Sequence, residues 1–419
     1  MLQLNFNSVS ETEPGEKWLS LFNTHWPAYR AWFVSKGAAT HPDLSTSVDM
    51  LQKYMPELMP LYKKLCNLTG NNEIANRFLT GYQPPAYISA CSQVVWKEEP
   101  MLVRNYDYHP HLSEGTLLHS AWNGRQVIAT GDCLWGVVDG MNEDGLVASL
   151  TFGGRKAVGK GFGIPVILRY VLEFCSNVQE AVDALKRIPS HMAYNIMVLD
   201  KTGAYKMVQL SPDRTPVVTD ALVSTNHQGV IDWPEHASFS KTVEREKFIL
   251  DELKTKGQDA EGIASSFLQS PLYNRQYNDG FGTIYTAVYK PALGAMELRW
   301  PDETMLQSFS NFIETKVTIT YTEKVPVQAP VYQVPQYADG EYASNADADY
   351  WVEYGKSWAT GKPVQLSMQV AKQIAGAIGL SAGEETDKLL EKFISENKRR
   401  GQIPWEMLAD VWSSLYKTA

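Results

Sequence analysis

Short strand-like runs separated by turn residues constrain the fold of this chain more than any other feature of its sequence. They recur between residues 86 and 300, and some end in turn sequences such as Asn142-Glu143-Asp144-Gly145. Helical patterns interrupt them at 165–174, 178–187 and 240–256 without strict alternation. We therefore expect an α+β fold in which helices cover antiparallel sheets. The runs are AYISACSQVVW, PMLVRNYDY, CLWGVVDGM, GLVASLTF, YNIMVLD, YKMVQL, ALVSTN, TIYTAVYK and AMELRW.

Segments of a different character flank this strand-rich part. From Glu16 to about Thr80, apolar residues recur at helical spacing, which predicts a predominantly helical segment. Around 322–345, several prolines without a helical period predict an extended linker, and three helical patterns follow it. We thus predict four parts: a helical N-terminal segment at 1–90 within the catalytic body, read as a candidate propeptide or small subunit, a catalytic domain at 91–321, a linker at 322–345 and a C-terminal helical region at 346–419.

Composition and charge argue against several kinds of binding partner. The net charge of -9 argues against nucleic acid, because a phosphate backbone favours clustered Lys and Arg. No apolar run approaches the roughly 18 residues of a membrane helix, and the N-terminal sequence lacks the features of a secretory signal. The four cysteines lie far apart without the CxxC spacing of a zinc or redox motif. We expect a cytoplasmic protein with reduced thiols, no cofactor, and neither nucleic acid nor membrane as partner.

Cys91 is distinguished from the other cysteines by its surroundings. Ala90 and Cys91 lie on one strand-like run, and Arg104-Asn105-Tyr106-Asp107 lies on the next. Pairing of these runs in a hairpin would bring a cation and a carboxylate beside the thiol. Alternation puts Asn105 and Asp107 on one face and Arg104 on the other. A nearby cation lowers the pKa of a thiol, so these residue types suit an activated nucleophile.

Eight motifs in a fixed order, over roughly residues 80–310, resemble one known family. This is the acyl-coenzyme A:isopenicillin N (6-aminopenicillanic acid) acyltransferase family of N-terminal-nucleophile cysteine hydrolases, which is distantly related to the choloylglycine (bile salt) hydrolases. The motifs are Ala90-Cys91, 104–107, 139–146, 149–154, 191–195, 224–227, 242–245 and 282–289.

The resemblance implies a four-layer αββα sandwich and a precursor that cuts its own Ala90–Cys91 bond. The thiol would attack the Ala90 carbonyl, and water would release the resulting ester. The freed α-amino group, whose pKa is ordinarily about 8, could then take the thiol proton and later protonate the leaving amine. No catalytic histidine would be needed.

The resemblance also implies roles for individual residues. Asn226 would donate its amide to the tetrahedral oxyanion, Asp107 would hold the α-ammonium, and Arg104 would steady the thiolate. Arg245 would be a structural or catalytic arginine, with Ser240 as an alternative. Thr151 stands where bile salt hydrolases carry a second oxyanion asparagine. Further candidates for substrate or oxyanion contacts are Asn105, Tyr106, Tyr194 and His227, and Trp122 and Trp135 are candidate pocket aromatics.

Other interpretations of these residues remain open. Cys91 could be a buried apolar residue, Arg104 and Asp107 a structural ion pair, and Asn226 a turn cap. His109, His111 and His119 form a cluster, but their spacing is poor for a metal and we predict no metal site. The glycine-rich stretch at 153–161 lacks Walker spacing, so we interpret it as a loop near the site.

The sequence favours one function and leaves two alternatives. The favoured function is an autoproteolytically activated cysteine amidase or acyltransferase, which acts on linear non-peptide amides through a Cys91 acyl-thioester. Its partner would be a small-molecule amide or acyl donor, and the C-terminal helices could form a homo-oligomer. One alternative is an uncleaved thiol hydrolase that pairs Cys91 with His227. The other is a non-catalytic binding or assembly protein on the same scaffold.

Overall fold

The computed structural model describes residues 2–35, 41–87, 89–277 and 281–322, and also Lys388, Glu391, Lys392 and Ser395. The chain divides into two compact units, residues 1–29 with 41–325 and residues 30–40 with 326–419. The predicted linker and C-terminal helical region, with its suggested role in oligomerisation, lie almost entirely outside the described residues. The predicted catalytic part lies in the first unit.

The described residues of the first unit form two β-sheets. The large sheet has the strand order β10-β9-β8-β7-β6-β5-β4-β1-β15, and the small sheet has the order β11-β2-β3-β12-β13-β14. One apolar core lies between them, with Val95 and Leu102 from the small sheet and Ile128 and Met141 from the large sheet. The strands are β1 Leu2–Glu11, β2 Ala90–Trp96, β3 Met101–Tyr108, β4 Thr116–Ser120, β5 Val127–Asp132, β6 Gly136–Asn142, β7 Val147–Phe152, β8 Tyr194–Leu199, β9 Tyr205–Leu210, β10 Val217–Thr219, β11 Val223–Ser224, β12 Gly282–Lys290, β13 Ala295–Trp300, β14 Glu303–Ser308 and β15 Thr315–Tyr321.

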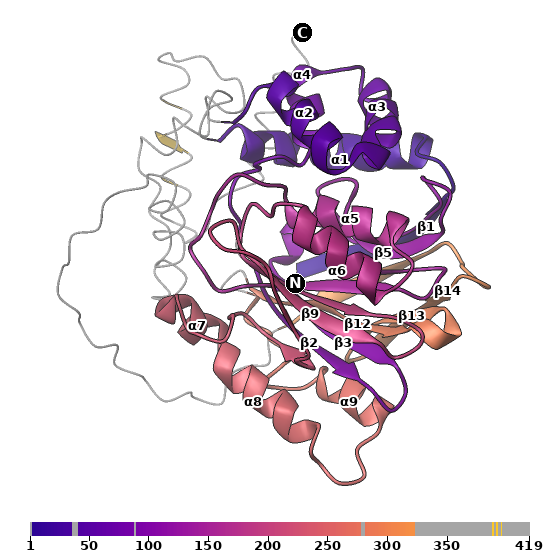
Figure 1. The fold of residues 1–419 in the computed structure, drawn as a ribbon, viewed down its shortest axis with the longest axis vertical. Helices are drawn as coiled ribbons and strands as arrows, with labels where there is room; N and C mark the ends of the chain where they lie inside the picture. Colours follow the sequence, from indigo (N-terminus) through magenta and orange to yellow (C-terminus); the bar gives the residue numbers. More distant parts are fainter. Residues whose placement is uncertain are drawn as a thin grey trace, which may run out of the picture. The chain divides into compact units, whose positions relative to one another are not determined.

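Helices cover the outer faces of both sheets (Figure 1). Helix α5 packs on β6 and α6 on β9, whereas α8 and α9 pack on β2 and β3. Every strand pairing in the described residues is antiparallel except that of β1 with β4. The predicted α+β fold of antiparallel sheets covered by helices is therefore confirmed. The helices are α1 Glu16–Phe33, α2 Leu44–Tyr54, α3 Met59–Leu68, α4 Glu73–Leu79, α5 Ile164–Phe174, α6 Val178–Arg187, α7 Pro234–Ser240, α8 Thr242–Glu252 and α9 Ala260–Ser266.

Helix α6 shows how the local sequence determines an element. Asn177 caps its first turn, because the side-chain oxygen accepts a hydrogen bond from the Glu180 nitrogen. The buried residues Val178, Ala181, Val182 and Leu185 recur at the spacing of one helix face. The observed bounds are those that the apolar pattern predicts.

Strand β1 is an element that the helical prediction for residues 1–90 did not include. It pairs with β4 on one side and with β15 on the other. Only Phe6 and Ser8 of this strand are buried, so its sequence lacks the long apolar run by which the other strands were found. Its place in the sheet depends on a partner more than 300 residues away, such as the pairing of Leu2 with Tyr321.

Candidate active site

Cys91 is the second residue of β2, an inner strand of the small sheet, and its side chain is fully buried in the core between the sheets. Its neighbour β11 pairs with β2 only at Val94 and Gln93 and so ends before reaching Cys91. Two side chains take the place of that strand. The Cys91 nitrogen donates to Asn226 Oδ1 at 3.1 Å, and the Cys91 carbonyl accepts from Arg245 Nη1 at 2.7 Å.

Arg104 lies on β3 and is held against the thiol. Its Nη2 is 3.2 Å from Cys91 Sγ, while its Nε donates to the Leu150 carbonyl at 2.9 Å. Its Nη1 pairs with Asp139 of the large sheet, and all of these side chains are buried. The guanidinium also lies 4.6 Å from the Tyr106 ring centre. With the guanidinium held on several sides, its charge stays directed at the sulfur.

Arg245, on α8, connects the groups around Cys91. Besides the Cys91 carbonyl, it donates to Ser92 Oγ at 2.6 Å and to Asn226 Oδ1 at 2.5 Å. Its Nε donates to the Ser240 carbonyl at 2.7 Å, so Ser240 takes part through its backbone. The arginine, rather than the serine side chain, thus faces Cys91.

Asp107 lies on the opposite face of β3 from Arg104, as alternation predicts. It accepts from Thr283 Oγ1 at 2.7 Å and lies 3.5 Å from Arg245 Nη1. Burial raises the pKa of its carboxyl to about 6, although Arg245 acts in the other direction. Asp107 contacts Arg245 rather than the nitrogen of Cys91 that it would hold after cleavage.

Burial also raises the pKa of the Cys91 thiol, and Arg104 only partly offsets this effect. A buried sulfur in such a site is protonated near neutral pH. Attack on a carbonyl therefore requires that a base remove the proton during the reaction.

The side-chain amide of Asn226 does not point its NH₂ group toward Cys91, as an oxyanion donor would. Its oxygen faces Cys91 and Arg245, and its Nδ2 donates to the Phe152 carbonyl at 3.1 Å. Its backbone nitrogen donates to Thr242 Oγ1 at 2.7 Å. In the uncleaved chain, the amide thus holds the nitrogen of Cys91.

The remaining aromatic and amide candidates divide into two groups. Tyr106 lies beside Arg104 and pairs with Cys91 across β2 and β3, whereas the Tyr194 ring lies 6.3 Å from that of Tyr87 in a tilted arrangement. Asn105 instead donates to the carbonyls of Phe267 and Leu272, which secures the segment after α9. Trp122 and Trp135 donate to the carbonyls of Glu11 and Leu79. The interpretation of these two tryptophans as pocket walls gains no support.

Thr151 and His227 have contacts apart from the thiol. Thr151 Oγ1 donates to the Thr225 carbonyl at 2.8 Å and accepts from Asn195 Nδ2 at 3.2 Å. His227 Nδ1 lies 3.1 Å from Thr242 Oγ1, and its Nε2 lies 3.3 Å from Glu246. Both ring nitrogens therefore face partners other than Cys91.

Sequence reasoning missed three residues that hold the site. Asp139 pairs with Arg104 across the two sheets, Thr283 binds Asp107, and Asn195 pairs with Thr151 on the adjacent strand. Each lies within a motif that carries the family resemblance, but the sequence analysis gave it no role of its own. A carboxylate inside the apolar run at 136–142 was a readable signal, because such a group needs a buried partner.

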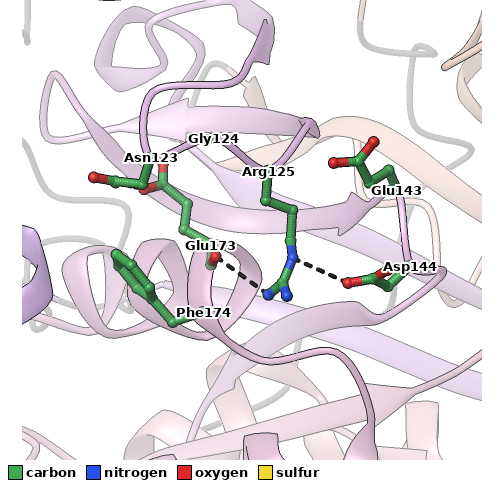
Figure 2. A pocket seen from close by; sticks show the side chains of 7 residues that line it. All are labelled: Asn123, Gly124, Arg125, Glu143, Asp144, Glu173 and Phe174. Atoms are coloured by element: carbon green, nitrogen blue, oxygen red, sulfur yellow. Dashed lines mark hydrogen bonds and ion pairs between the residues drawn. The ribbon is translucent and has the colours of Figure 1, made fainter.

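Outside the site, the described residues hold no group of three His, Cys, Asp or Glu side chains that could bind a metal ion. Within the same residues, no helix is long and apolar enough to cross a membrane. A surface pocket of about 470 Å³ lies between Asn123, Arg125, Asp144 and Glu173 (Figure 2). Arg125 is bonded there to Asp144 and to the Glu173 carbonyl, and none of the predicted site residues lines it.

The fold and the site together define a class of protein. It is an α+β protein of two stacked sheets, in which Cys91 is buried near the start of an inner strand. The side chains of Arg104, Arg245 and Asn226 surround this residue. A family model described as acyl-coenzyme A:6-aminopenicillanic acid acyl-transferase matches residues 95–304, half of the chain. The chain belongs to this family, which confirms the resemblance seen in the sequence. It is an enzyme that hydrolyses carbon–nitrogen bonds other than peptide bonds, or transfers the acyl group of amides. The matched range begins just after Cys91.

The solved structures that are similar to this chain include the following three. An N-acylethanolamine-hydrolyzing acid amidase (NAAA) ortholog of Caenorhabditis elegans has 18% identity over 55% of this chain and 100% of its own, with a TM-score of 0.38. Penicillin V acylase from Agrobacterium tumefaciens has 13% identity over 53% and 86%, with a TM-score of 0.37. A mutant of conjugated bile acid hydrolase from Clostridium perfringens has 14% identity over 56% and 97%, with a TM-score of 0.32. Such scores do not establish a shared fold. No curated protein matches the chain.

Proposed function

We propose that this enzyme is an autoproteolytically activated cysteine amidase or acyltransferase, which acts on linear non-peptide amides through an acyl-thioester on Cys91. The observation that carries the proposal is that both the sulfur and the backbone nitrogen of Cys91 lie against side-chain partners. Its sulfur lies 3.2 Å from Arg104, and its own backbone nitrogen lies 3.1 Å from the Asn226 oxygen. Self-cleavage would use both atoms, and both are fixed in the uncleaved chain.

Self-cleavage begins when Cys91 Sγ adds to the Ala90 carbonyl carbon. The carbon–nitrogen bond between Ala90 and Cys91 then breaks, the Cys91 nitrogen takes the thiol proton, and the Ala90 acyl group remains on sulfur. Water adds to this thioester, releases the Ala90 carboxylate and restores the thiol. The new α-amine stays beside the Asn226 oxygen, which accepts a hydrogen bond from it.

Turnover of a substrate repeats the same chemistry with an external amide. The α-amine, whose pKa is ordinarily about 8, takes the proton of the buried thiol as sulfur adds to the substrate carbonyl. The same proton then goes to the leaving amine, and the acyl group remains on Cys91. Attack by water completes hydrolysis, and attack by another amine or a thiol completes acyl transfer.

The alternative of an uncleaved Cys-His hydrolase has weaker support. Its base would be His227, whose ring nitrogens lie beside Thr242 and Glu246. A non-catalytic binding protein would not require a guanidinium beside a buried sulfur. The contacts of Arg104 and Arg245 therefore favour the cysteine enzyme.

Intact-mass measurement of the purified protein tests self-cleavage. We expect two fragments, which begin at Met1 and at Cys91. Cys91→Ala should leave a single chain without amidase activity, while Cys175→Ala, which changes another buried thiol, should be cleaved as usual. A single 47.0 kDa chain that turns over amides would overturn the α-amine mechanism and favour the Cys-His alternative. Suitable substrates for the assay are N-acylethanolamines, conjugated bile acids and penicillin V, which the names of its relatives denote.

A further inference from the structure

Thr283, on β12, is a hydrogen-bond donor to Asp107 of the neighbouring strand. The two residues lie directly opposite each other in the pairing of β3 with β12, and Ala90 lies opposite Asp107 on β2. Thr283 Oγ1 donates to Asp107 Oδ1 at 2.7 Å, and both side chains are buried. The carboxyl group therefore lies in one row between its donor and the residue that precedes Cys91.

The proton of the Thr283 hydroxyl group is directed toward Asp107. The Asn274 nitrogen lies 2.8 Å from Thr283 Oγ1, and a backbone N–H group can only donate. Oγ1 is thus the acceptor in that bond, and its own proton points to the carboxyl oxygen. A hydrogen bond donated to a carboxylate favours the ionised form. The two bonds together make Thr283 a donor of fixed direction.

The backbone of Thr283 is held in the same way as its side chain. Its nitrogen donates to the Asn274 carbonyl at 2.8 Å, and its carbonyl accepts from the Tyr277 hydroxyl group at 2.7 Å. Asn105 of β3 binds the start of this segment after α9. Because both backbone groups are bonded, the hydroxyl group keeps its position relative to the carboxyl group.

A β-bulge in β12 lets this strand serve both faces of the site. The register with β3 shifts between Thr283 and Tyr285. Residues two apart on a regular strand point to the same face, but the extra residue separates these two. Thr283 contacts Asp107 on one face, while the Tyr285 hydroxyl group lies 3.3 Å from Arg104 Nη1 on the other. The bulge therefore directs Thr283 at Asp107 without moving Tyr285 from Arg104.

We propose that Thr283 is a positioning residue, whose hydroxyl group binds Oδ1 of the Asp107 carboxylate so that Oδ2 can hold the α-ammonium group of Cys91 after cleavage. This step rests on the proposed function. Asp107 Oδ2 lies 3.5 Å from Arg245 Nη1, which is too long for a strong hydrogen bond. Oδ2 can therefore bind the new ammonium group while Oδ1 stays with Thr283.

The same hydrogen bond acts on the charge of Asp107. Burial raises the pKa of its carboxyl group to about 6, whereas the charge of Arg245, the hydrogen bond from Thr283 and the charge of Arg104 act in the other direction. Cys91, on β2, and Tyr273, after α9, also interact with this carboxyl group electrostatically. Loss of the Thr283 hydroxyl group should raise the pKa, so that Asp107 takes up its proton at a higher pH.

Infrared titration of the uncleaved chain tests this donation independently of catalysis. In Cys91→Ala, the carbonyl band of the protonated Asp107 carboxyl group is identified by its loss in Cys91→Ala/Asp107→Asn. We expect its midpoint to rise by about one pH unit in Cys91→Ala/Thr283→Val, which removes the hydroxyl group at nearly constant shape. Thr283→Ser, which keeps the hydroxyl group, should leave the midpoint unchanged in the same background. Tyr277→Phe, which loosens only the backbone of Thr283, should do so too.

An unchanged midpoint in the valine variant would overturn the proposal, as would an equal rise with Tyr277→Phe. Thr283→Ala makes the same test if the valine variant does not fold. In the enzyme with Cys91 intact, Thr283→Val should lower kcat more than it changes KM, and more at pH 6 than at pH 8, while Thr283→Ser restores kcat. An equal loss at both pH values would indicate a structural role alone and refute the proposal. Failure of self-cleavage would appear separately, as a single mass for the wild-type chain, and would leave the titration result intact.

Discussion

Asn226 presents its side-chain oxygen to Cys91, while its Nδ2 is bound to the Phe152 carbonyl. This orientation suggests two successive roles. Before cleavage the oxygen holds the scissile nitrogen, and after cleavage the Nδ2 could serve the substrate oxyanion as the family resemblance implies. One residue would then act in two reactions through different atoms.

Replacement of Asn226 by Asp separates these roles. The variant keeps an oxygen that can accept from the Cys91 nitrogen and from Arg245, so we expect self-cleavage to continue within about tenfold of the wild-type rate. The variant lacks the Nδ2 donor, so amide turnover should fall by about 10²- to 10³-fold. Intact mass and kcat provide the two measurements, and unchanged turnover would show that Asn226 is not an oxyanion donor. As a control, Asn226→Leu removes both groups and should impair both reactions.

For individual residues, the sequence predicted the direction of side chains along one strand better than contacts between residues far apart in the chain. Alternation along 101–108 correctly put Arg104 and Asp107 on opposite faces. The pairing of Arg104 with Asp139 was not predictable, because it depends on how the two sheets stack. The approach of Arg245 to Cys91 depends on the packing of α8 on the small sheet, and only the family resemblance suggested it.

Among the elements, the turn after β7 supports the site through close backbone contact. Gly154 has φ +66, and a Cβ there would lie only 2.1 Å from the Asn226 carbonyl oxygen. The glycine therefore lets the turn pack directly against the residue that holds Cys91. The glycine-rich stretch at 153–161, which the sequence analysis interprets as a loop near the site, thus contacts Asn226 at its start.

Gly154→Ala should displace Asn226 and slow self-cleavage by more than tenfold. The matched control is Gly229→Ala, because Gly229 has φ +86 and no atom within 4 Å of the added Cβ. Both variants carry the backbone strain of about 1–2 kcal/mol for a left-handed residue, but only the first has the clash. Urea unfolding and cleavage rates measure the two effects. Equal cleavage rates in the two variants would exclude the contact as a positioning device.

A buried acidic cluster links α1 to the β5–β6 turn. The Tyr29 hydroxyl lies 2.7 Å from Glu114 Oε1 and 2.8 Å from Asp132 Oδ1, so one hydroxyl proton faces two carboxyl groups. Burial, followed by the charge of Glu114, raises the pKa of Asp132 to about 7. The folded protein therefore retains a proton that the unfolded chain loses at lower pH.

The sign of the pH dependence follows from this shift. An unfolded Asp ionises near pH 4, whereas folded Asp132 ionises near pH 7, so this group makes stability fall as pH rises between these values. Asp132→Asn should flatten the decline in the free energy of unfolding from about pH 4 to pH 7, as measured by urea titration. Asp251→Asn, at an exposed position of α8, should leave it unchanged. If the free energy of unfolding of Asp132→Asn fell as steeply with pH as that of the wild type, Asp132 would not be the source of the decline.

For the whole molecule, β1 determines the fate of the N-terminal fragment. The strand lies between β4 and β15, and its residues 2–8 are all in register with β15. Cleavage after Ala90 would leave these pairings unbroken. If cleavage occurs as proposed, the 1–90 segment, interpreted from sequence as a candidate propeptide or small subunit, would remain attached as a subunit. The sequence did not reveal this, because β1 has few buried residues and a distant partner.

We expect the two cleavage fragments to remain together under native conditions. They should elute as one species in size-exclusion chromatography and separate only in denaturant. Substitution of Phe6, a buried residue of β1 that packs on Tyr285 and Trp300, by Asp should loosen the association, whereas Asn5→Asp at the exposed face should not. Loss of the small fragment from the unmodified protein under native conditions would contradict the topology.

The long separation along the chain between Cys91 and the residues that hold it also sets an order of events during synthesis. Arg245 follows Cys91 by 154 residues, and Asn226 follows it by 135. At a translation rate of about 5–20 residues per second, the thiol waits roughly 8–30 s on the ribosome before its last contact is made. The contacts around Cys91 can therefore form only after β2, β3 and β11 and the start of α8 have been translated. If the enzyme cleaves itself as proposed, this delay would keep an unfinished chain from cutting itself.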